Sequence, residues 1–195
     1  RTLLIVSVQR GKRRSKLAIE LAESFGGLEK SIIVDADLRN PQIGIEYDLE
    51  KLTPGLTNFI SRRSSFTDSN FRKKGSQLSV MPSGAIPSDP LVYLTKPRFG
   101  EFIKKLGVLF ESVVIETPPV NEYGDALVVS KVVDAVILLC DLEVTESADL
   151  LEAIQSFQDA GAPLLGVVFE NVKNIKSKIP QRSRSKNFVR KMISY

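Results

Sequence analysis

Six short runs rich in Val, Ile and Leu alternate along this chain with longer segments whose apolar residues have helical spacing. This alternation constrains the fold more than any other feature. Most of the runs are continuously apolar, without the in-and-out pattern of a strand that faces water on one side. Parallel strands covered on both faces have this character. The six expected strands are residues 2–8, 31–37, 78–84, 112–119, 134–143 and 163–172.

The segments between the runs have the length and spacing of amphipathic helices. We expect helices at residues 15–25, 55–62, 90–109 with a break at Pro97, 125–133 and 145–160, and a loop at 62–77. Strands and helices in alternation predict an α/β fold, with a doubly wound, mostly parallel sheet and helices on both faces. Ligands of such sheets bind at the carboxyl ends of the strands. Polar residues directly after the apolar runs are therefore the candidates for a functional site.

The length of 195 residues suits one domain with a sizeable core, which we expect at residues 1–172, followed by a tail at 173–195. From Val172 onward the chain contains eight Lys and Arg and no acidic residue. Such a tail indicates an anionic partner, for instance a membrane surface, or else a solvated end. Because the chain begins at Arg1, with no initiator Met, we expect it to be part of a longer protein. Whether a membrane segment precedes it is left open.

Composition excludes several classes of site. No run approaches the ~20 uninterrupted apolar residues of a membrane-spanning helix. A single cysteine, Cys140, excludes disulfide frameworks and zinc–cysteine clusters, and it suits a reducing compartment. The absence of histidine excludes Ser-His-Asp triads and histidine metal sites.

Three of the expected strand ends carry polar motifs. "SVQRGKRRSK" follows the first run, "DADLRNP" ends the second, and "ETPP" ends the fourth. With their strands, "SIIVDADLRNP" resembles the second, acidic Walker motif of the bacterial tyrosine kinases (BY-kinases), and "VVIETPPV" with "GDALVVSKVVDAVILL" resembles their Walker B segment and the helix and strand behind it. "LSVMPSGAIPSDP" and "DAGAPLLGVVFENV" resemble two further segments of the family. The resemblance runs from Leu3 to Val172 in the family's order.

BY-kinases are the cytoplasmic kinase domains of polysaccharide co-polymerases, which govern the length and export of capsular and exopolysaccharides. They are P-loop NTPases that bind Mg-ATP, form rings and phosphorylate a C-terminal tyrosine cluster in trans. For this chain the resemblance implies a P-loop NTPase-like fold and Mg-ATP or ADP as cofactor if the site works. It also implies a cytoplasmic location at the inner face of the bacterial plasma membrane. The implied partners are a transmembrane co-polymerase segment or subunit and further copies of the chain, while nucleic acid is not expected.

The phosphate-binding loop departs most from the family pattern. Gly11 is retained, and Ser15 stands where a hydroxyl would ligate Mg²⁺. Arg13 replaces a glycine that lets the backbone approach the phosphates, Arg14 replaces the phosphate-binding lysine, and Lys16 replaces a threonine. Arginine keeps the charge, but its planar fork does not replace a compact ammonium in a tight loop. These five residues are the candidates for nucleotide binding.

Five cations therefore crowd the start of the expected helix: Arg10, Lys12, Arg13, Arg14 and Lys16. The start of a helix favours negative charge, so such a cluster is unfavourable unless an anion binds there or the side chains spread into water. The segment is either an anion site of altered shape or a solvated loop without catalytic demand, and we favour the second interpretation.

The two acidic motifs are better preserved. In the family's pattern the carboxylates corresponding to Asp35 and Asp37 hold Mg²⁺ through water and help to deprotonate the incoming tyrosine hydroxyl. Arg39 matches the arginine of the motif, and Glu116 replaces the Walker B aspartate. The resemblance thus implies these four as catalytic residues, and Ser15, Asp37 and Glu116 as the Mg²⁺ ligands. The alternative is that the carboxylates only hold the following loop, which would preserve them in an inactive site.

Three functions fit this sequence. The first is a pseudokinase that regulates or scaffolds polysaccharide synthesis and export, because loss of the loop glycine and lysine together removes positioning and charge stabilisation. The second is an active ATP-dependent tyrosine autokinase, which the intact Asp35 and Asp37 favour. The third is another deviant P-loop ATPase with an anionic partner. Tyr195 is the candidate phosphoacceptor, or an ordinary last residue.

Overall fold

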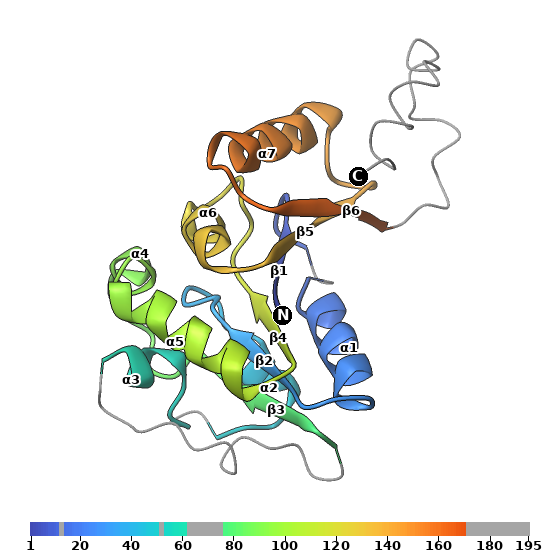
Figure 1. The fold of residues 1–195 in the computed structure, drawn as a ribbon. Coiled ribbons are helices and arrows are strands. Elements are labelled where there is room, and N and C mark those ends of the chain that lie inside the picture. The colour runs from blue at the N-terminus through green and yellow to red at the C-terminus, as the bar shows by residue number, and fades with distance from the viewer. Residues whose placement is uncertain (12–13, 51–52, 62–75, 171–195) are drawn as a thin grey trace.

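A computed structural model describes residues 1–11, 14–50, 53–61 and 76–170 of the chain. Within these ranges six parallel strands form one sheet: β1 (Thr2–Ser7), β2 (Ser31–Asp35), β3 (Leu78–Met81), β4 (Ser112–Glu116), β5 (Ala135–Asp141) and β6 (Leu164–Glu170). Their order across the sheet is β3-β2-β4-β1-β5-β6 (Figure 1). This confirms the predicted parallel α/β sheet. Because β4 lies between β2 and β1, the three polar motifs that follow these strands meet at the carboxyl ends of the sheet.

One face of the sheet is covered by α1 (Arg14–Gly26) and the short α2 (Ile43–Glu46). The residues that α1 buries recur every four positions, and Ala18 and Ala22 pack with Ile5, Ile33 and Val114 of the sheet. Small residues on this stripe let the helix lie close to the strands. At its last residue, Gly26, a Cβ atom would lie 2.6 Å from Cβ of Leu78, so only glycine allows this approach.

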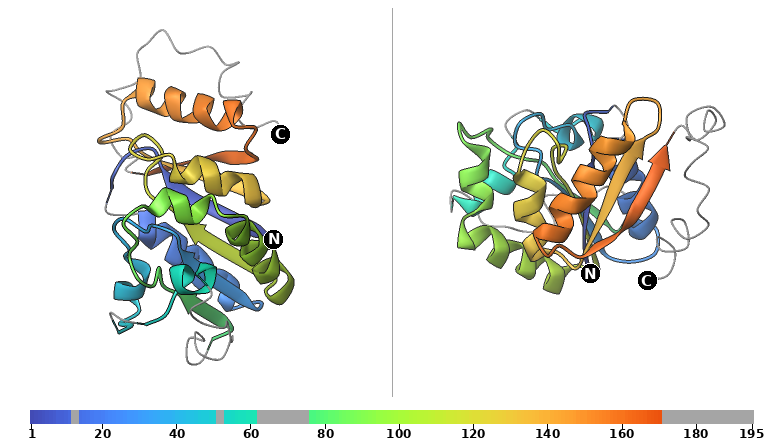
Figure 2. Two further views of the ribbon diagram at one scale, coloured as in Figure 1. Left: turned by 90° about the vertical axis from the view of Figure 1, so that its left-hand side faces the viewer. Right: turned by 90° about the horizontal axis from the view of Figure 1, so that it is seen from above.

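The opposite face carries α3 (Leu56–Ile60), α4 (Pro90–Leu94), α5 (Pro97–Leu109), α6 (Asp125–Val129) with a 3₁₀ turn at Ser130–Val132, and α7 (Ser147–Asp159) (Figures 1 and 2). Phe99 and Ile103 of α5 and Phe157 of α7 are buried in the core on this side. Helices therefore cover both faces, as the doubly wound pattern predicts.

The expected helices all occur, with boundaries shifted by one or a few residues. The segment at 90–109 divides at Pro97 as predicted, because proline begins a helix readily but cannot continue one. The sequence did not predict α2, whose four residues are too few for a helical period. The expected loop at 62–77 lies almost wholly outside the described residues, as does the tail.

The last strand departs from expectation. We predicted strands buried on both faces, but β6 is only partly covered, and Leu165, Val168 and Phe169 are exposed. Among the described residues β6 pairs with β5 alone, which makes it an edge strand with α7 packed on one side. In the described part of the chain, no helix is long and apolar enough to cross a membrane.

Asp134 joins the beginnings of β1 and β5. Its Oδ2 accepts a hydrogen bond of 2.7 Å from the Thr2 backbone N–H, and this bond lowers the pKa of the carboxyl below its usual value. The backbone N–H of Asp134 in turn donates to Thr2 Oγ1 at 2.9 Å. A carboxyl with a lowered folded-state pKa stabilises the fold above its unfolded pKa, and this contribution is lost as the pH falls through the folded value.

Asp134→Asn should therefore lower the free energy of unfolding at neutral pH, and its difference from the native protein should shrink as the pH falls below about 4. Urea unfolding between pH 3 and pH 7 measures this. Asp159→Asn, the same substitution at an exposed aspartate, is the control. If the difference in the free energy of unfolding between Asp134→Asn and the native protein stays constant with pH, the lowered pKa of Asp134 is contradicted.

Candidate active site at the carboxyl ends of β1, β2 and β4

Arg14 lies at the start of α1 and is 6% exposed. Its Nε donates to Glu116 Oε1 at 2.5 Å, and its Nη2 donates to Asp37 Oδ2 at 2.6 Å. The guanidinium thus bridges a carboxylate at the end of β4 and one just beyond the end of β2. Its planar arrangement of donors suits two acceptors in different directions. Arg14 is therefore paired with protein carboxylates.

Glu116 is fully buried at the end of β4 and shares its Oε1 between two donors. Besides Arg14, the Ser15 hydroxyl donates to this oxygen at 2.7 Å. The other oxygen, Oε2, is buried without a protein hydrogen-bond partner among the described residues. Burial raises the pKa of Glu116, and the Arg14 charge opposes that rise. Glu116 therefore depends on Arg14 for its compensation.

Asp35, the last residue of β2, is fully buried beside Glu116 in the register of the sheet. Its two oxygens accept from the backbone N–H groups of Asp37 at 3.1 Å and Ile43 at 3.0 Å. Desolvation, with the nearby Glu116 charge, raises the pKa of Asp35 well above its usual value. These bonds fasten both ends of the loop that runs from β2 to α2. In this structure Asp35 acts as a loop anchor.

Asp37 has a double role. Its Oδ1 accepts from the backbone N–H groups of Arg39 at 3.1 Å and Asn40 at 2.9 Å, while Oδ2 accepts from Arg14. One oxygen therefore shapes the loop after β2, and the other takes part in the ion pair. The interpretation that the acidic motif holds the following loop agrees with these contacts.

Arg39 points to a different partner from the other motif residues. Its Nε and Nη2 donate to the two oxygens of Asp125, at 2.8 and 3.3 Å, and its guanidinium lies 4.1 Å from the ring centroid of Tyr123. Asp125 is fully buried at the start of α6. Arg39 thereby links the loop after β2 to the segment after β4.

Sequence reasoning did not identify the partners Glu122, Tyr123 and Asp125. All three lie in "VNEYGD", directly after the "ETPP" motif, where acidic residues next to a strand end could have been matched with the excess of cations in the first loop. Glu122 accepts from Arg10 Nη2 at 2.9 Å and from the Arg10 backbone N–H at 3.1 Å.

Of the five clustered cations, the described ones are paired with carboxylates. Arg10 pairs with Glu122, Arg14 with Asp37 and Glu116, and the exposed Lys16 lies 3.6 Å from Glu20. Lys12 and Arg13 lie outside the described residues, as does Tyr195. Gly11 is described, and an added Cβ would meet nothing within 4 Å, so no close approach requires glycine there.

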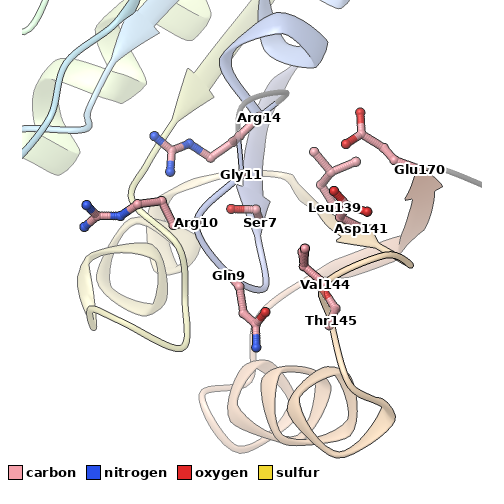
Figure 3. A pocket seen from close by; sticks show the side chains of 10 residues that line it. All are labelled: Ser7, Gln9, Arg10, Gly11, Arg14, Leu139, Asp141, Val144, Thr145 and Glu170. Atoms are coloured by element: carbon pink, nitrogen blue, oxygen red, sulfur yellow. The ribbon is translucent and has the colours of Figure 1, made fainter.

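A small pocket adjoins the loop after β1. Its volume is about 10 Å³, room for roughly one water molecule. It is lined by Ser7, Gln9, Arg10, Gly11, Arg14, Leu139, Asp141, Val144, Thr145 and Glu170. Figure 3 shows the side chains of Arg10 and Arg14 on one side of the loop, while Asp141 and Glu170 lie on the other. The side of the pocket formed by β5 and β6 therefore carries two carboxyl side chains.

The residues that the resemblance assigns to Mg²⁺ do converge. Ser15, Asp37 and Glu116 supply the hard oxygen atoms that Mg²⁺ prefers. However, Arg14 lies between the two carboxylates, and Ser15 donates its hydroxyl to Glu116. In the described ranges, no group of three or more His, Cys, Asp or Glu side chains is placed to hold a metal. As arranged, these residues do not fit a divalent ion.

The loop-anchoring role of Asp35 has a measurable consequence. In Asp35→Asn the amide nitrogen would face one of the two backbone N–H donors, so one buried hydrogen bond is lost. We expect the free energy of unfolding to fall by about 1–3 kcal/mol in urea denaturation at mildly acidic pH, where the raised pKa leaves Asp35 uncharged and the substitution removes no buried charge. Asp48→Asn is the matched control, because Asp48 is exposed and its φ of 52° is one that asparagine adopts readily. Equal stabilities of the two variants would exclude the anchoring role.

Several named proteins resemble this chain in both sequence and fold. The chain is 27% identical over 171 residues to the tyrosine-protein kinase CpsD of Streptococcus agalactiae serotype III (strain NEM316), an alignment that spans 87% of this chain and 74% of CpsD. No protein-family model matches the chain.

Among solved structures, the VpsO kinase domain superposes with a TM-score of 0.83 at 26% identity, over 87% of this chain and 83% of that one. The septum site-determining protein MinD of Pyrococcus horikoshii OT3, complexed with Mg-ADP, gives a TM-score of 0.72 at 18% identity, over 93% and 74% of the two chains. The MinD likeness concerns the fold alone. In sequence and in fold, this chain is a homologue of the bacterial tyrosine-protein kinases.

Proposed function

We propose that this chain is a pseudokinase: a BY-kinase-like domain that regulates or scaffolds capsular or exopolysaccharide synthesis and export, with impaired ATP binding and kinase activity. Its homology to bacterial tyrosine kinases supports the polysaccharide role. The proposed location is the inner face of the bacterial plasma membrane. There the domain associates with a transmembrane co-polymerase segment or subunit and with further copies of itself.

The observation that carries the proposal is the position of Arg14. A phosphate-binding cation must be free to meet the negative charge of the nucleotide, but this guanidinium is buried between Asp37 and Glu116. Catalysis of phosphoryl transfer depends almost entirely on positioning and charge stabilisation. A cation held by the protein's own carboxylates supplies neither to the phosphates.

The size of the effect follows from the burial of the ion pairs. Separating one partner from a buried pair costs about 3–5 kcal/mol, because a desolvated charge is left uncompensated. If Arg14 had to leave its carboxylates before a nucleotide could bind, the apparent affinity would fall by roughly 10²- to 10⁴-fold. That loss is enough to move a micromolar site towards the millimolar range.

The pocket beside the loop supports the same conclusion. Of its lining cations, Arg14 is already paired with Asp37 and Glu116. Arg10, the other described cation of the lining, is paired with Glu122. A nucleotide that used these two cations would have to break their pairs with the protein's own carboxylates.

The second candidate function is an active tyrosine autokinase. The convergence of Ser15, Asp37 and Glu116 favours it, because these are the side chains that the resemblance assigns to Mg²⁺. This function requires Arg14 to leave the carboxylates when Mg-ATP arrives, and it requires Tyr195 to accept the phosphate.

Calorimetric titration with ATP, with and without Mg²⁺, separates the two functions. We expect the native protein to show no Mg²⁺-dependent binding in the micromolar range. The double variant Arg13→Gly/Arg14→Lys should gain such binding, because it restores the glycine and the compact ammonium of the family's loop. Micromolar Mg²⁺-dependent binding by the native protein would overturn the pseudokinase proposal.

Phosphate transfer is the second test. With radiolabelled ATP and Mg²⁺, the native protein should incorporate no label above that of Tyr195→Phe, while CpsD of Streptococcus agalactiae serves as the positive control. Label that depends on Tyr195 would establish the autokinase instead.

A further inference from the structure

The ion pairs of Arg14 with Asp37 and Glu116 have the form of a metal site with the cation built into the chain. Asp37 approaches from the loop after β2, Glu116 from the end of β4 and Ser15 from the first turn of α1. Nε and Nη2 of the guanidinium lie within 2.6 Å of carboxylate oxygens of two separate chain segments. Asp37, Glu116 and Ser15 are also the residues that would hold a divalent ion here.

We propose that Arg14 is a tethered cation that replaces the divalent ion of this site, so that the folded domain excludes Mg²⁺ and its removal creates a divalent-cation site from Asp37, Glu116 and Ser15. The inference deepens the proposed function, because it names the cause of the impaired site. It concerns the metal alone and is tested without nucleotide.

Charge compensation explains why the two cations exclude each other. Asp37 is 2% exposed and Glu116 fully buried, and a desolvated carboxylate requires a counter-charge close by. Arg14 supplies it within hydrogen-bonding distance. A second, divalent cation at the same place would meet the guanidinium in a medium of low dielectric constant, where like charges repel strongly.

The oxygens left over do not form a second site for the ion. Asp37 Oδ1 is occupied by two backbone N–H groups, and both oxygens of Asp35 accept from backbone N–H groups. Glu116 Oε2 is the carboxylate oxygen of this cluster without a protein partner among the described residues. A single oxygen does not hold Mg²⁺, which demands near-octahedral coordination.

Mn²⁺, a paramagnetic substitute for Mg²⁺, provides a direct readout by electron paramagnetic resonance. We expect the resonance signal of free Mn²⁺ to be unchanged by the native protein, up to millimolar concentrations of Mn²⁺. Arg14→Gln should bind one Mn²⁺ at least ~10-fold more tightly, because three hard oxygen ligands are then exposed to the ion. Mg²⁺ should compete with Mn²⁺ for this site.

Thermal unfolding gives the second readout. Without metal, Arg14→Gln should melt about 6–15 °C below the native protein, because two buried carboxylates lose their counter-charge. Millimolar Mn²⁺ should restore a large part of that shift by binding only the folded state. The native melting temperature should not respond to the metal.

Two control variants make the result specific. Arg14→Gln/Asp37→Asn removes one of the carboxylates and should lose the gained Mn²⁺ affinity. Arg98→Gln changes the net charge equally on α5, where Arg98 donates to the Phe59 carbonyl, and should behave like the native protein. If Arg14→Gln is unfolded without metal, Mn²⁺ should fold it, as followed by circular dichroism.

Mn²⁺ binding by the native protein through Asp37 would overturn the proposal, and so would an Arg14→Gln protein that neither binds Mn²⁺ nor folds with it. These outcomes are distinct from failure of the pseudokinase proposal. A native protein that binds ATP but no free Mn²⁺ would contradict the pseudokinase proposal alone.

Discussion

The arrangement of this site depends on one electrostatic requirement: carboxylates buried at the ends of adjacent parallel strands need a positive charge among them. The register of the sheet places Asp35 directly beside Glu116, and Asp37 follows two residues later. Backbone N–H groups bond both oxygens of Asp35, whereas Glu116 and the second oxygen of Asp37 are paired with a cation. Arg14 provides that cation from the first residue of α1, and the start of this helix is thereby held against β2 and β4.

The acidic motif also has a structural role that does not depend on catalysis. Asp35 and Asp37 organise the loop between β2 and α2 through four backbone hydrogen bonds, independently of any nucleotide. Arg39 joins this loop to Asp125 and Tyr123. Substituting these residues would disturb the fold at this edge of the sheet whether or not the domain transfers phosphate. The presence of Asp35, Asp37 and Arg39 therefore supports kinase activity only weakly. The departures of the phosphate loop from the family pattern argue against activity more strongly.

Much of the architecture could be predicted because most elements carry a local signal. Continuously apolar runs predicted the buried central strands, and Pro97 predicted the break between α4 and α5. Burial of β6 could not be read from its composition, because an edge strand and a central one have similar residues and differ only in their neighbours. The four-residue α2 gave no periodic signal, and it follows from the anchoring of Ile43 by Asp35.

The sequence by itself determined the fold class, the strand-end position of the site and its relation to the bacterial tyrosine kinases, because these depend on periodicity and on the order of motifs along the chain. The resemblance also implied that Arg14 stands at the lysine position of the family's phosphate loop, but not what the arginine does. Only the tertiary structure decided that Arg14 pairs with Asp37 and Glu116, that Arg39 pairs with Asp125, and that Asp35 is a loop anchor. Each of these pairings joins residues distant in the chain, and the direction of a long charged side chain follows from the charges that folding brings around it.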